Sequence, residues 1–428
     1  MTNEIKQRIE QIQNGEIPEG YRYTNVGISP KDWDYGCLGD VLYNVKREVP
    51  KPTQPYWRIG IRSHAKGTFH EYVKDPENVS MTELYIVKEN DLILNITFAW
   101  EHAVALAEKK DDGLLVSHRF PTYVFKDGQN PVFFKSIAMQ ERFKEMLGHI
   151  SPGGAGRNRV MSRTDFLKLN CVIPPTEEQN KIAAILMQYD KVIELHNRMI
   201  EQLRMLKKVC LRKMFPEKGE SFPEWRFPQY TDAWEQRKLS ECAGFRRGSF
   251  PQPYGNREWY DGEGAMPFVQ VADVSDDLKL VNDTKQKISK LAQPMSVFAE
   301  KGSVLVTLQG SIGRVAITQY EAFVDRTVLI FDNYNQNICK TFWAYIIKEK
   351  FIEEAKKAPG GTIKKITKEV LSNFDLILPN YDEQQHIGNF FSNLDNLITL
   401  HQRELQEHEE RKKVLMQLLL TGIVRVKK

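Results

Sequence analysis

The chain has 428 residues, more than one ordinary domain holds, with 41% hydrophobic and 27% charged side chains, a composition typical of globular proteins. The formal net charge of +4 permits nucleic-acid binding without requiring it. No run of eighteen apolar residues occurs and residues 1–10 are polar, so we expect neither a membrane anchor nor a signal peptide. The five cysteines are scattered without a CxxC pair, which argues against a zinc site or a disulfide framework and favours a cytoplasmic location.

In chain order, the sequence predicts an α+β protein in which globular domains alternate with long helices. The expected segments are an N-terminal helix and linker (residues 1–30), a first globular domain (31–175), a central helix (176–216), a linker (217–232), a second globular domain (233–378) and a C-terminal helix (379–428). Alternating apolar residues predict short strands in the globular domains, at residues 92–96, 122–125, 303–307 and 328–331. Amphipathic stretches predict a helix in each domain, at residues 132–147 and 341–357.

The chain contains an internal repeat. Residues 174–215 align with residues 379–420 without a gap at an offset of 205, and twelve of the 42 aligned positions are identical. Weaker matches precede both segments, whereas residues 41–147 and 243–357 have little in common beyond points such as Arg119 and Arg326. The sequence therefore predicts a protein with pseudo-two-fold symmetry. Each half has a dissimilar middle segment (41–147 or 243–357) between segments that resemble those of the other half.

Both repeated segments are predicted to be long helices, because each follows a proline breaker and begins with acidic residues. Their apolar residues recur at steps of three and four, which predicts a coiled-coil seam. In the first helix the seam is Ile182, Ile185, Tyr189, Val192, His196, Met199, Leu203, Leu206 and Cys210; in the second it is Ile387, Phe390, Leu394, Leu397, His401, Leu405, His408 and Leu415. If the helices pack antiparallel, His196 and His401 meet near their midpoints.

The sequence lacks the common motifs of catalytic, nucleotide-binding and metal sites. No GxxxxGK[ST] phosphate loop and no HExxH metal motif occurs. The sequences Ile-Pro-Pro-Thr at Pro174 and Leu-Pro-Asn-Tyr at Pro379 lack the leading polar residue of the catalytic loop of an adenine methyltransferase. We therefore predict no catalytic residues, no metal site and no cofactor bound by this chain.

Two equivalent loops are rich in glycine and free of acidic residues. Glycine lets a backbone approach a phosphate closely, and neighbouring cations neutralise the phosphate, so these loops are predicted to contact DNA. The first loop carries Arg157, Asn158, Arg159 and Arg163, and the second carries Lys364 and Lys365.

Further candidate DNA-binding residues are long polar side chains in the dissimilar middles. Arginine pairs naturally with guanine, and glutamine or asparagine with adenine. In the first domain the candidates are Arg58, Arg62, His64, Lys66 and His102; in the second they are Arg246, Arg247, Gln252, Asn256, Gln270, Gln309 and Arg314.

The combined pattern resembles the specificity subunit of type I restriction–modification enzymes across essentially the whole chain. The resemblance rests on the Glu-Gln-x-x-Ile strings that follow Pro174 and Pro379, and on the Ile-Pro-Glu-Gly-Tyr and Phe-Pro-Glu-Trp openings at Ile17 and Phe222. It implies two target recognition domains that each read one half of a split site in double-stranded DNA, with antiparallel helices as the spacer. It also implies two modification subunits that use S-adenosylmethionine and two restriction subunits that use ATP and magnesium.

Two alternatives stay open at the level of sequence. The chain could be a stand-alone or fused DNA methyltransferase or endonuclease with an unrecognised catalytic site, although the missing cofactor loop argues against it. It could instead be a coiled-coil scaffold that binds only protein, which a lack of salt-dependent DNA binding would favour.

Overall fold

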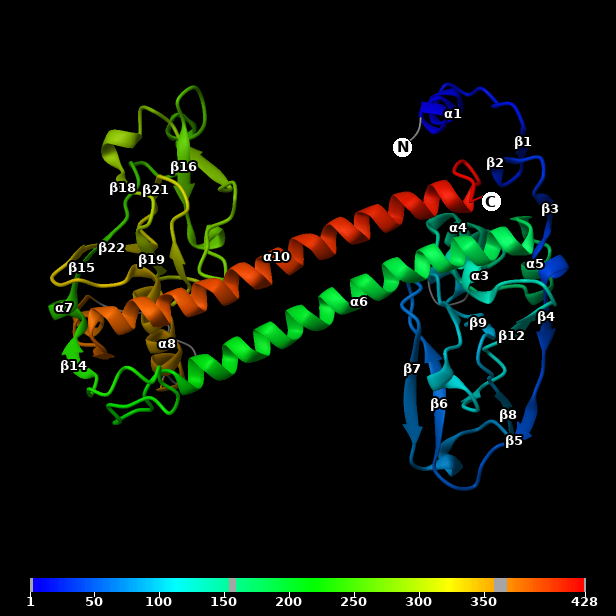
Figure 1. Cartoon of the computed structure of the whole chain (residues 1–428), viewed down its shortest axis with the longest axis horizontal. Helices are drawn as coiled ribbons and strands as arrows, with labels where there is room; N and C mark the ends of the chain where they lie inside the picture. Colours follow the sequence, from blue (N-terminus) through cyan, green and yellow to red (C-terminus); the bar gives the residue numbers. More distant parts are fainter. Residues whose placement is uncertain (1–2, 154–158, 358–367, 427–428) are drawn as a thin grey trace. The chain divides into compact units, whose positions relative to one another are not determined.

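The structure, a computed structural model, describes residues 3–153, 159–357 and 368–426. The chain forms two compact units: unit 1 comprises Met1–Leu195 with Glu404–Lys428, and unit 2 is His196–Arg403. Both unit boundaries fall inside the two longest helices, α6 (Thr176–Lys213) and α10 (Tyr381–Leu420), drawn in green and orange-red in Figure 1. None of the described helices is long and apolar enough to cross a membrane.

Unit 1 is built around two sheets. The first has the strand order β10-β9-β12-β4, and the second has the order β5-β8-β11-β6-β7, in which β6 and β11 are parallel. A short pair, β3 with β13, joins the start of the globular region to its end. The strands are β1 Tyr21–Thr24, β2 Gly27–Pro30, β3 Asp34–Cys37, β4 Leu42–Val45, β5 Glu48–Pro50, β6 Tyr56–Ile61, β7 Thr68–Val73, β8 Glu83–Ile86, β9 Leu92–Leu94, β10 Val104–Leu106, β11 Leu115–Val116, β12 Thr122–Phe125 and β13 Asn170–Ile173. The short helices are α1 Asn3–Gln13, α2 Leu38–Val41, η1 Pro76–Asn78, η2 Ala99–Glu101, η3 Lys109–Asp111, α3 Pro131–Ala138, α4 Glu141–His149 and α5 Arg163–Leu167.

Unit 2 repeats this topology. Its first sheet has the order β15-β22-β19-β20, which corresponds strand for strand to β4-β12-β9-β10, and its second has the order β17-β16-β21-β18 with β16 and β21 parallel. The strands are β14 Glu235–Lys238, β15 Ala243–Arg247, β16 Met266–Val269, β17 Gln286–Ile288, β18 Val297–Ala299, β19 Val304–Thr307, β20 Val315–Ile317, β21 Ala322–Val324, β22 Val328–Tyr334 and β23 Asp375–Leu378. The remaining helices are α7 Leu239–Cys242, η4 Arg257–Trp259, η5 Val271–Asp273, η6 Gln293–Met295, α8 Lys340–Lys357 and α9 Lys368–Ser372. The two middles have little sequence in common, yet their first sheets share one strand order, whereas their second sheets have five and four strands.

The four predicted strands correspond to β9, β12, β19 and β22, and the predicted helix at 341–357 is α8. The predicted single helix at 132–147 is wrong, because the chain breaks it into α3 and α4 at Gln140, whose backbone is extended (φ −75°, ψ 144°). Phe134 and Ala138 share one helix face, but Phe143 follows Ala138 by five residues and would sit about 140° away on a continuous helix. The break lets Phe143 and Leu147 point into the core with Phe134.

The long helices are antiparallel within each unit. In unit 1, the start of α6 packs against the end of α10, with Ile182 and Leu186 beside Leu419. In unit 2, the end of α6 packs against the start of α10, with Cys210 beside Phe391. His196 and His401 meet as predicted, since their Nδ1 atoms lie 3.2 Å apart.

The seam follows the predicted path only in part. Met199, Leu206 and Leu397 are 41%, 45% and 44% exposed, whereas Ile200 and Ile398 are buried. After His196 the stripe of buried or half-buried side chains continues at Ile200, Leu203, Lys207 and Cys210. Lys207 takes a seam position because its amine pairs with Asp395, and the equivalent Lys412 pairs with Asp190.

A buried glutamate anchors the start of α6. Arg425, which follows the end of α10, donates to both carboxylate oxygens of Glu178 at 2.8 and 2.7 Å, and the Trp33 indole donates at 2.9 Å. The Glu178 side chain is 7% exposed. Burial alone would raise the pKa of Glu178, but the hydrogen bonds from Arg425 and Trp33 outweigh burial and hold this pKa below its usual value.

The start of α10 has the equivalent anchor. Arg226, which follows the end of α6, donates to both oxygens of Glu383 at 2.7 Å, and the Glu383 side chain is fully buried. The glutamine that follows each glutamate ties its helix to the segment before it, since the side-chain amides of Gln179 and Gln384 donate to the carbonyls of Pro174 and Pro379. The repeated Glu-Gln string is thus explained by the same contacts in both units.

We predict that the Arg425→Ala substitution destabilises unit 1 by about 3 kcal/mol, because it leaves a buried carboxylate without its cation. Urea unfolding followed by circular dichroism measures the change. The control is Arg411→Ala, which removes an exposed pair with Glu407 and should cost less than about 0.5 kcal/mol.

The stabilisation by the Glu178–Arg425 pair should depend on pH. Because the folded-state pKa of Glu178 is depressed, the stabilisation is complete above pH of about 4.3 and is lost as pH falls through the folded-state pKa. The stability difference between wild type and Arg425→Ala should therefore shrink on acidification. A difference that stayed constant down to pH 2 would contradict the assigned role of the pair.

Candidate nucleic-acid interface

Three of the predicted DNA-binding residues lie on one tightly held loop in unit 1. The loop at residues 62–67 joins β6 to β7, and its backbone bonds to the η2 turn, His64 N to Glu101 O and Ala65 N to His102 O, both at 2.8 Å. His64 and Ala65 have φ of 62° and 51°, which are left-handed conformations that non-glycine residues rarely adopt. The exposed side chains of this loop are Arg62, His64 and Lys66, and they alternate with the half-buried Ser63 and Ala65. The loop therefore presents three polar side chains to solvent from a fixed backbone.

Beside this loop lies a positively charged recess of about 180 Å³. Arg62, Lys66, Lys110 and Lys135 line it, and Glu108 is the only acid among the described residues that line it. Glu108 binds Lys110 at 2.8 Å and Lys135 at 3.5 Å, and the bond to Lys110 holds the pKa of Glu108 below its usual value. With four cations around one carboxylate, the recess suits an anionic group such as a phosphate.

His102 does not face solvent, contrary to the sequence-based prediction. Its side chain is buried, and its Nε2 lies 2.6 Å from the carbonyl oxygen of Ala138. Burial lowers the pKa of the His102 imidazole, which favours the neutral form. Since His102 also ends η2 in a left-handed conformation (φ 65°), its role is to hold the turn to which the 62–67 loop is tied.

The other described unit 1 candidates are not among the residues that line the recess. The guanidinium of Arg159 lies over the Trp100 ring at 5.5 Å, which brings it to the η2 turn. Arg163 binds the carbonyl of His118, and Arg58 forms a two-point pair with Glu71 across the β6–β7 hairpin. Arg157 and Asn158 lie outside the described residues.

In unit 2, a second recess of about 290 Å³ lies where β15 approaches α9. Among the described residues, its lining includes Arg246, Arg247 and Lys368 and no acidic residue. Arg246 is engaged by Asp332 and by the carbonyl of Phe298, and Arg247 is exposed. Lys364 and Lys365 lie outside the described residues.

The remaining unit 2 candidates do not gather at this recess. Gln309 is exposed on a turn that the Thr307 hydroxyl closes by accepting from the backbone N–H of Arg314 at 3.0 Å. Arg314 pairs with Asp276 at 3.0 Å. The other three side chains are Gln270, half-buried where η5 begins, Gln252, which is exposed, and Asn256, which accepts from Glu258 N at the start of η4.

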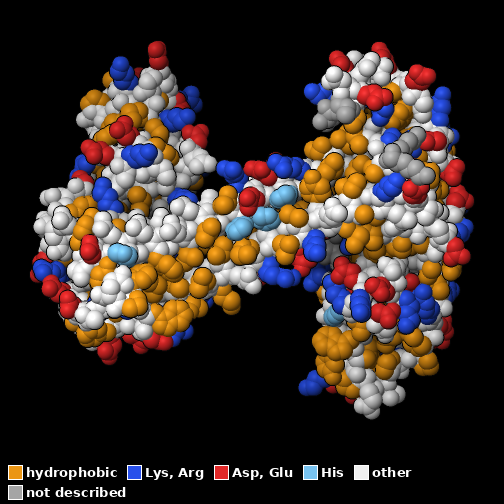
Figure 2. Space-filling model, viewed as in Figure 1, with side chains coloured by type: hydrophobic (Ala, Val, Ile, Leu, Met, Phe, Trp, Pro, Cys, Tyr) orange, Lys and Arg blue, Asp and Glu red, His pale blue; other side chains and the backbone are white. Residues whose placement is uncertain are grey.

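Sequence reasoning missed Lys110, Lys135, Trp100 and Arg326. Lys110 and Lys135 belong to η3 and α3, and only the fold brings them to the 62–67 loop. Arg326 lies 4.8 Å over the Phe250 ring, and its alignment with Arg119 was the available signal. Across the face drawn in Figure 2, basic and acidic side chains are interspersed on both units, so the local recesses carry more information than the net charge.

Known proteins share this architecture over nearly the whole chain. The MjaVIII specificity subunit of a type I restriction enzyme from Methanocaldococcus jannaschii is 26% identical over 93% of this chain and 94% of its own length. A second protein of that organism, provisionally named the MjaX specificity subunit, is 25% identical over 96% of this chain and 97% of its own length. The solved S subunit of a type I restriction–modification system from M. genitalium shares the fold, with a TM-score of 0.57 and 15% identity over 90% of this chain and 96% of that chain.

The family model described as the type I restriction modification DNA specificity domain matches twice, at residues 30–205 and 231–410. Each match covers one globular region together with most of the long helix that follows it. Because the two matches span most of the chain, this protein belongs to the family of type I restriction–modification DNA specificity subunits.

Proposed function

We propose that this chain reads a bipartite sequence in double-stranded DNA, with one target recognition domain (31–175 and 233–378) per half-site. The double match to the specificity domain is the observation that carries the proposal. The equivalent strand orders of the two units support it, because one scaffold then presents two different sets of loops. Loops on a rigid scaffold can vary in sequence while the fold stays the same.

Within each domain, cations would hold the DNA backbone and neighbouring polar side chains would read the bases. The cationic recesses at Lys110 and at Arg247 suit phosphate contacts. His64 and Gln309 are exposed on turns that hydrogen bonds hold in place, which suits contacts to base edges. The acid-free loops with Arg157 and Asn158 and with Lys364 and Lys365 stay part of the proposed interface.

The chemistry of restriction and modification would come from partner subunits. We propose two modification subunits that use S-adenosylmethionine and two restriction subunits that use ATP and magnesium, all assembled with this chain in the cytoplasm. In this arrangement the chain itself contributes specificity and a docking frame, and its two long helices separate the recognition domains.

We predict that exchanging residues 33–169 for the same region of a relative changes one half of the methylated target and leaves the other half unchanged. The reason is that each strand scaffold closes on itself within one unit, through β3 with β13 and through β14 with β23. Mapping methylated adenines in the genome of a cell that carries the hybrid measures the result. A change in both halves of the target would refute one domain per half-site, and methyl transfer by the chain without partners would favour the enzyme alternative.

We also predict that Arg62→Ala combined with Lys110→Ala weakens binding of the assembled complex to any DNA sequence. The slope of log K against log salt should fall by about one for each phosphate group that the variant no longer neutralises, with no change in the preferred sequence. The matched control is Lys181→Ala, a lysine on α6 paired with Glu177 at 3.0 Å. Fluorescence anisotropy over a salt series measures both slopes, and equal slopes for the two variants would exclude the recess from the interface.

A further inference from the structure

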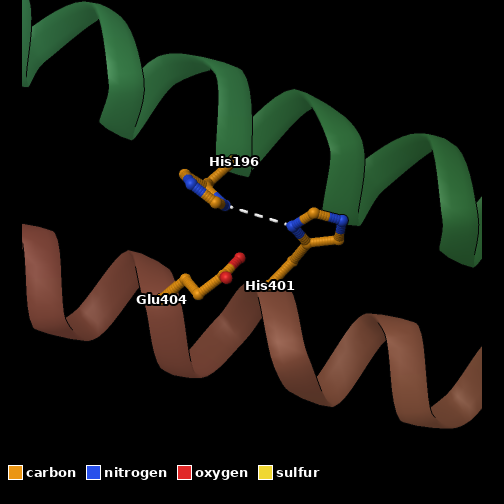
Figure 3. A group of neighbouring side chains, drawn as sticks. All are labelled: His196, His401 and Glu404. Atoms are coloured by element: carbon orange, nitrogen blue, oxygen red, sulfur yellow. Dashed lines mark hydrogen bonds between the residues drawn. The ribbon is translucent and has the colours of Figure 1, made fainter.

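Two equivalent histidines of the repeat face each other across the long helices. His196 on α6 and His401 on α10 approach with their Nδ1 atoms 3.2 Å apart and their ring centroids 5.2 Å apart (Figure 3). Both side chains are half-buried. The arrangement is thus a pair of imidazole nitrogens, held by two helices and partly sheltered from water.

The separation of these nitrogens is close to that of two ligands on one metal ion. Two imidazole nitrogens bound to tetrahedral zinc at about 2.05 Å lie about 3.3 Å apart. A plain hydrogen bond also gives 3.2 Å, so the distance alone does not distinguish the two arrangements.

A third donor near the two imidazoles favours a metal site over a plain hydrogen bond. Glu404 follows His401 by three residues on α10, so both side chains project from the same helix face. One ligand atom from each of His196, His401 and Glu404 lies within 4.8 Å of the others. Two imidazoles with one carboxylate form a ligand set that zinc and related first-row ions prefer.

We propose that His196, His401 and Glu404 bind a divalent transition-metal ion of the zinc class, with the fourth position left to water. The sequence did not predict this site because its ligands come from two helices 205 residues apart and form no local motif. The prediction that the chain binds no metal is therefore revised by the proposal. The inference does not depend on the proposed DNA function.

The surrounding charges tolerate a cation. Arg198 and Arg403 each follow a histidine by two residues, about 200° around the helix, and both are exposed to solvent, where salt screens their charge. Further along the seam, Lys207 is neutralised by Asp395 and Lys412 by Asp190.

Bound metal would stabilise the pairing of the two helices. Only the folded chain brings the two histidines together, so binding shifts the folding equilibrium towards the folded state by mass action. The ion would therefore set the register of α6 against α10 more strongly than the hydrogen bond between the two imidazoles.

Calorimetric titration of the metal-free full-length chain with Zn²⁺ tests the proposal. We expect one ion per chain, and binding weakened by about tenfold or more in His196→Gln, His401→Gln and Glu404→Gln. The control is His118→Gln, which alters an exposed histidine outside the group and should bind as wild type does. Equal Zn²⁺ affinity in wild type and the His196 and His401 variants, or no binding by wild type, overturns the site, and unchanged binding by Glu404→Gln alone overturns the assignment of the carboxylate.

Binding of Co²⁺ to the wild-type chain tests the site without requiring any variant to fold. Co²⁺ bound to wild type should show the visible absorption of a tetrahedral nitrogen and oxygen site and should raise the melting temperature. A thiolate charge-transfer band would instead assign the metal to a cysteine such as Cys37 and would overturn the proposal. The absence of any Co²⁺-dependent absorption would do the same.

Discussion

The fold depends on two buried carboxylates, Glu178 and Glu383, each neutralised by an arginine from the other repeat. A buried carboxylate without a cation is strongly unfavourable, so each helix can begin only where Arg425 or Arg226 reaches it. Both arginines lie beyond the end of the opposite helix. The start of each long helix is therefore held to the end of the other, and antiparallel pairing follows within each unit.

Five of the twelve positions that are identical between the repeats make polar contacts that are equivalent in the two copies. Glu178, Gln179, Asp190, His196 and Lys207 each have an identical counterpart 205 residues later, and each makes the same kind of bond as its counterpart. The repeat thus keeps the polar contacts of α6 and α10, while the loops of the two globular regions differ in sequence.

Sequence patterns were sufficient where one local signal determined the structure, as for β12 and α8, and where the internal repeat did so, as for the meeting of His196 with His401. They failed where tertiary contacts decided between local alternatives. Lys207 displaces Leu206 from the seam because Asp395 lies opposite, and Gln140 breaks a helix so that Phe143 can reach the core. The candidate interface shows the same limit, since His102 is buried and the three lysines of the recess come from separate parts of the chain.

The loop at residues 62–67 of unit 1 suggests how one fold could serve for the recognition of many DNA targets. Residues 62–67 are bonded to η2 through the backbone N–H groups of His64 and Ala65, which do not depend on the identity of those side chains, whereas the Arg62 side chain itself donates to the carbonyl of Thr68. His64 and Lys66 can therefore change while the loop conformation stays the same, provided that the left-handed positions are tolerated. A preorganised loop also loses little conformational entropy on binding, so more of the contact energy remains for discrimination between bases. Specificity can then change by substitution on a constant backbone, which agrees with two units that share strand order and little sequence.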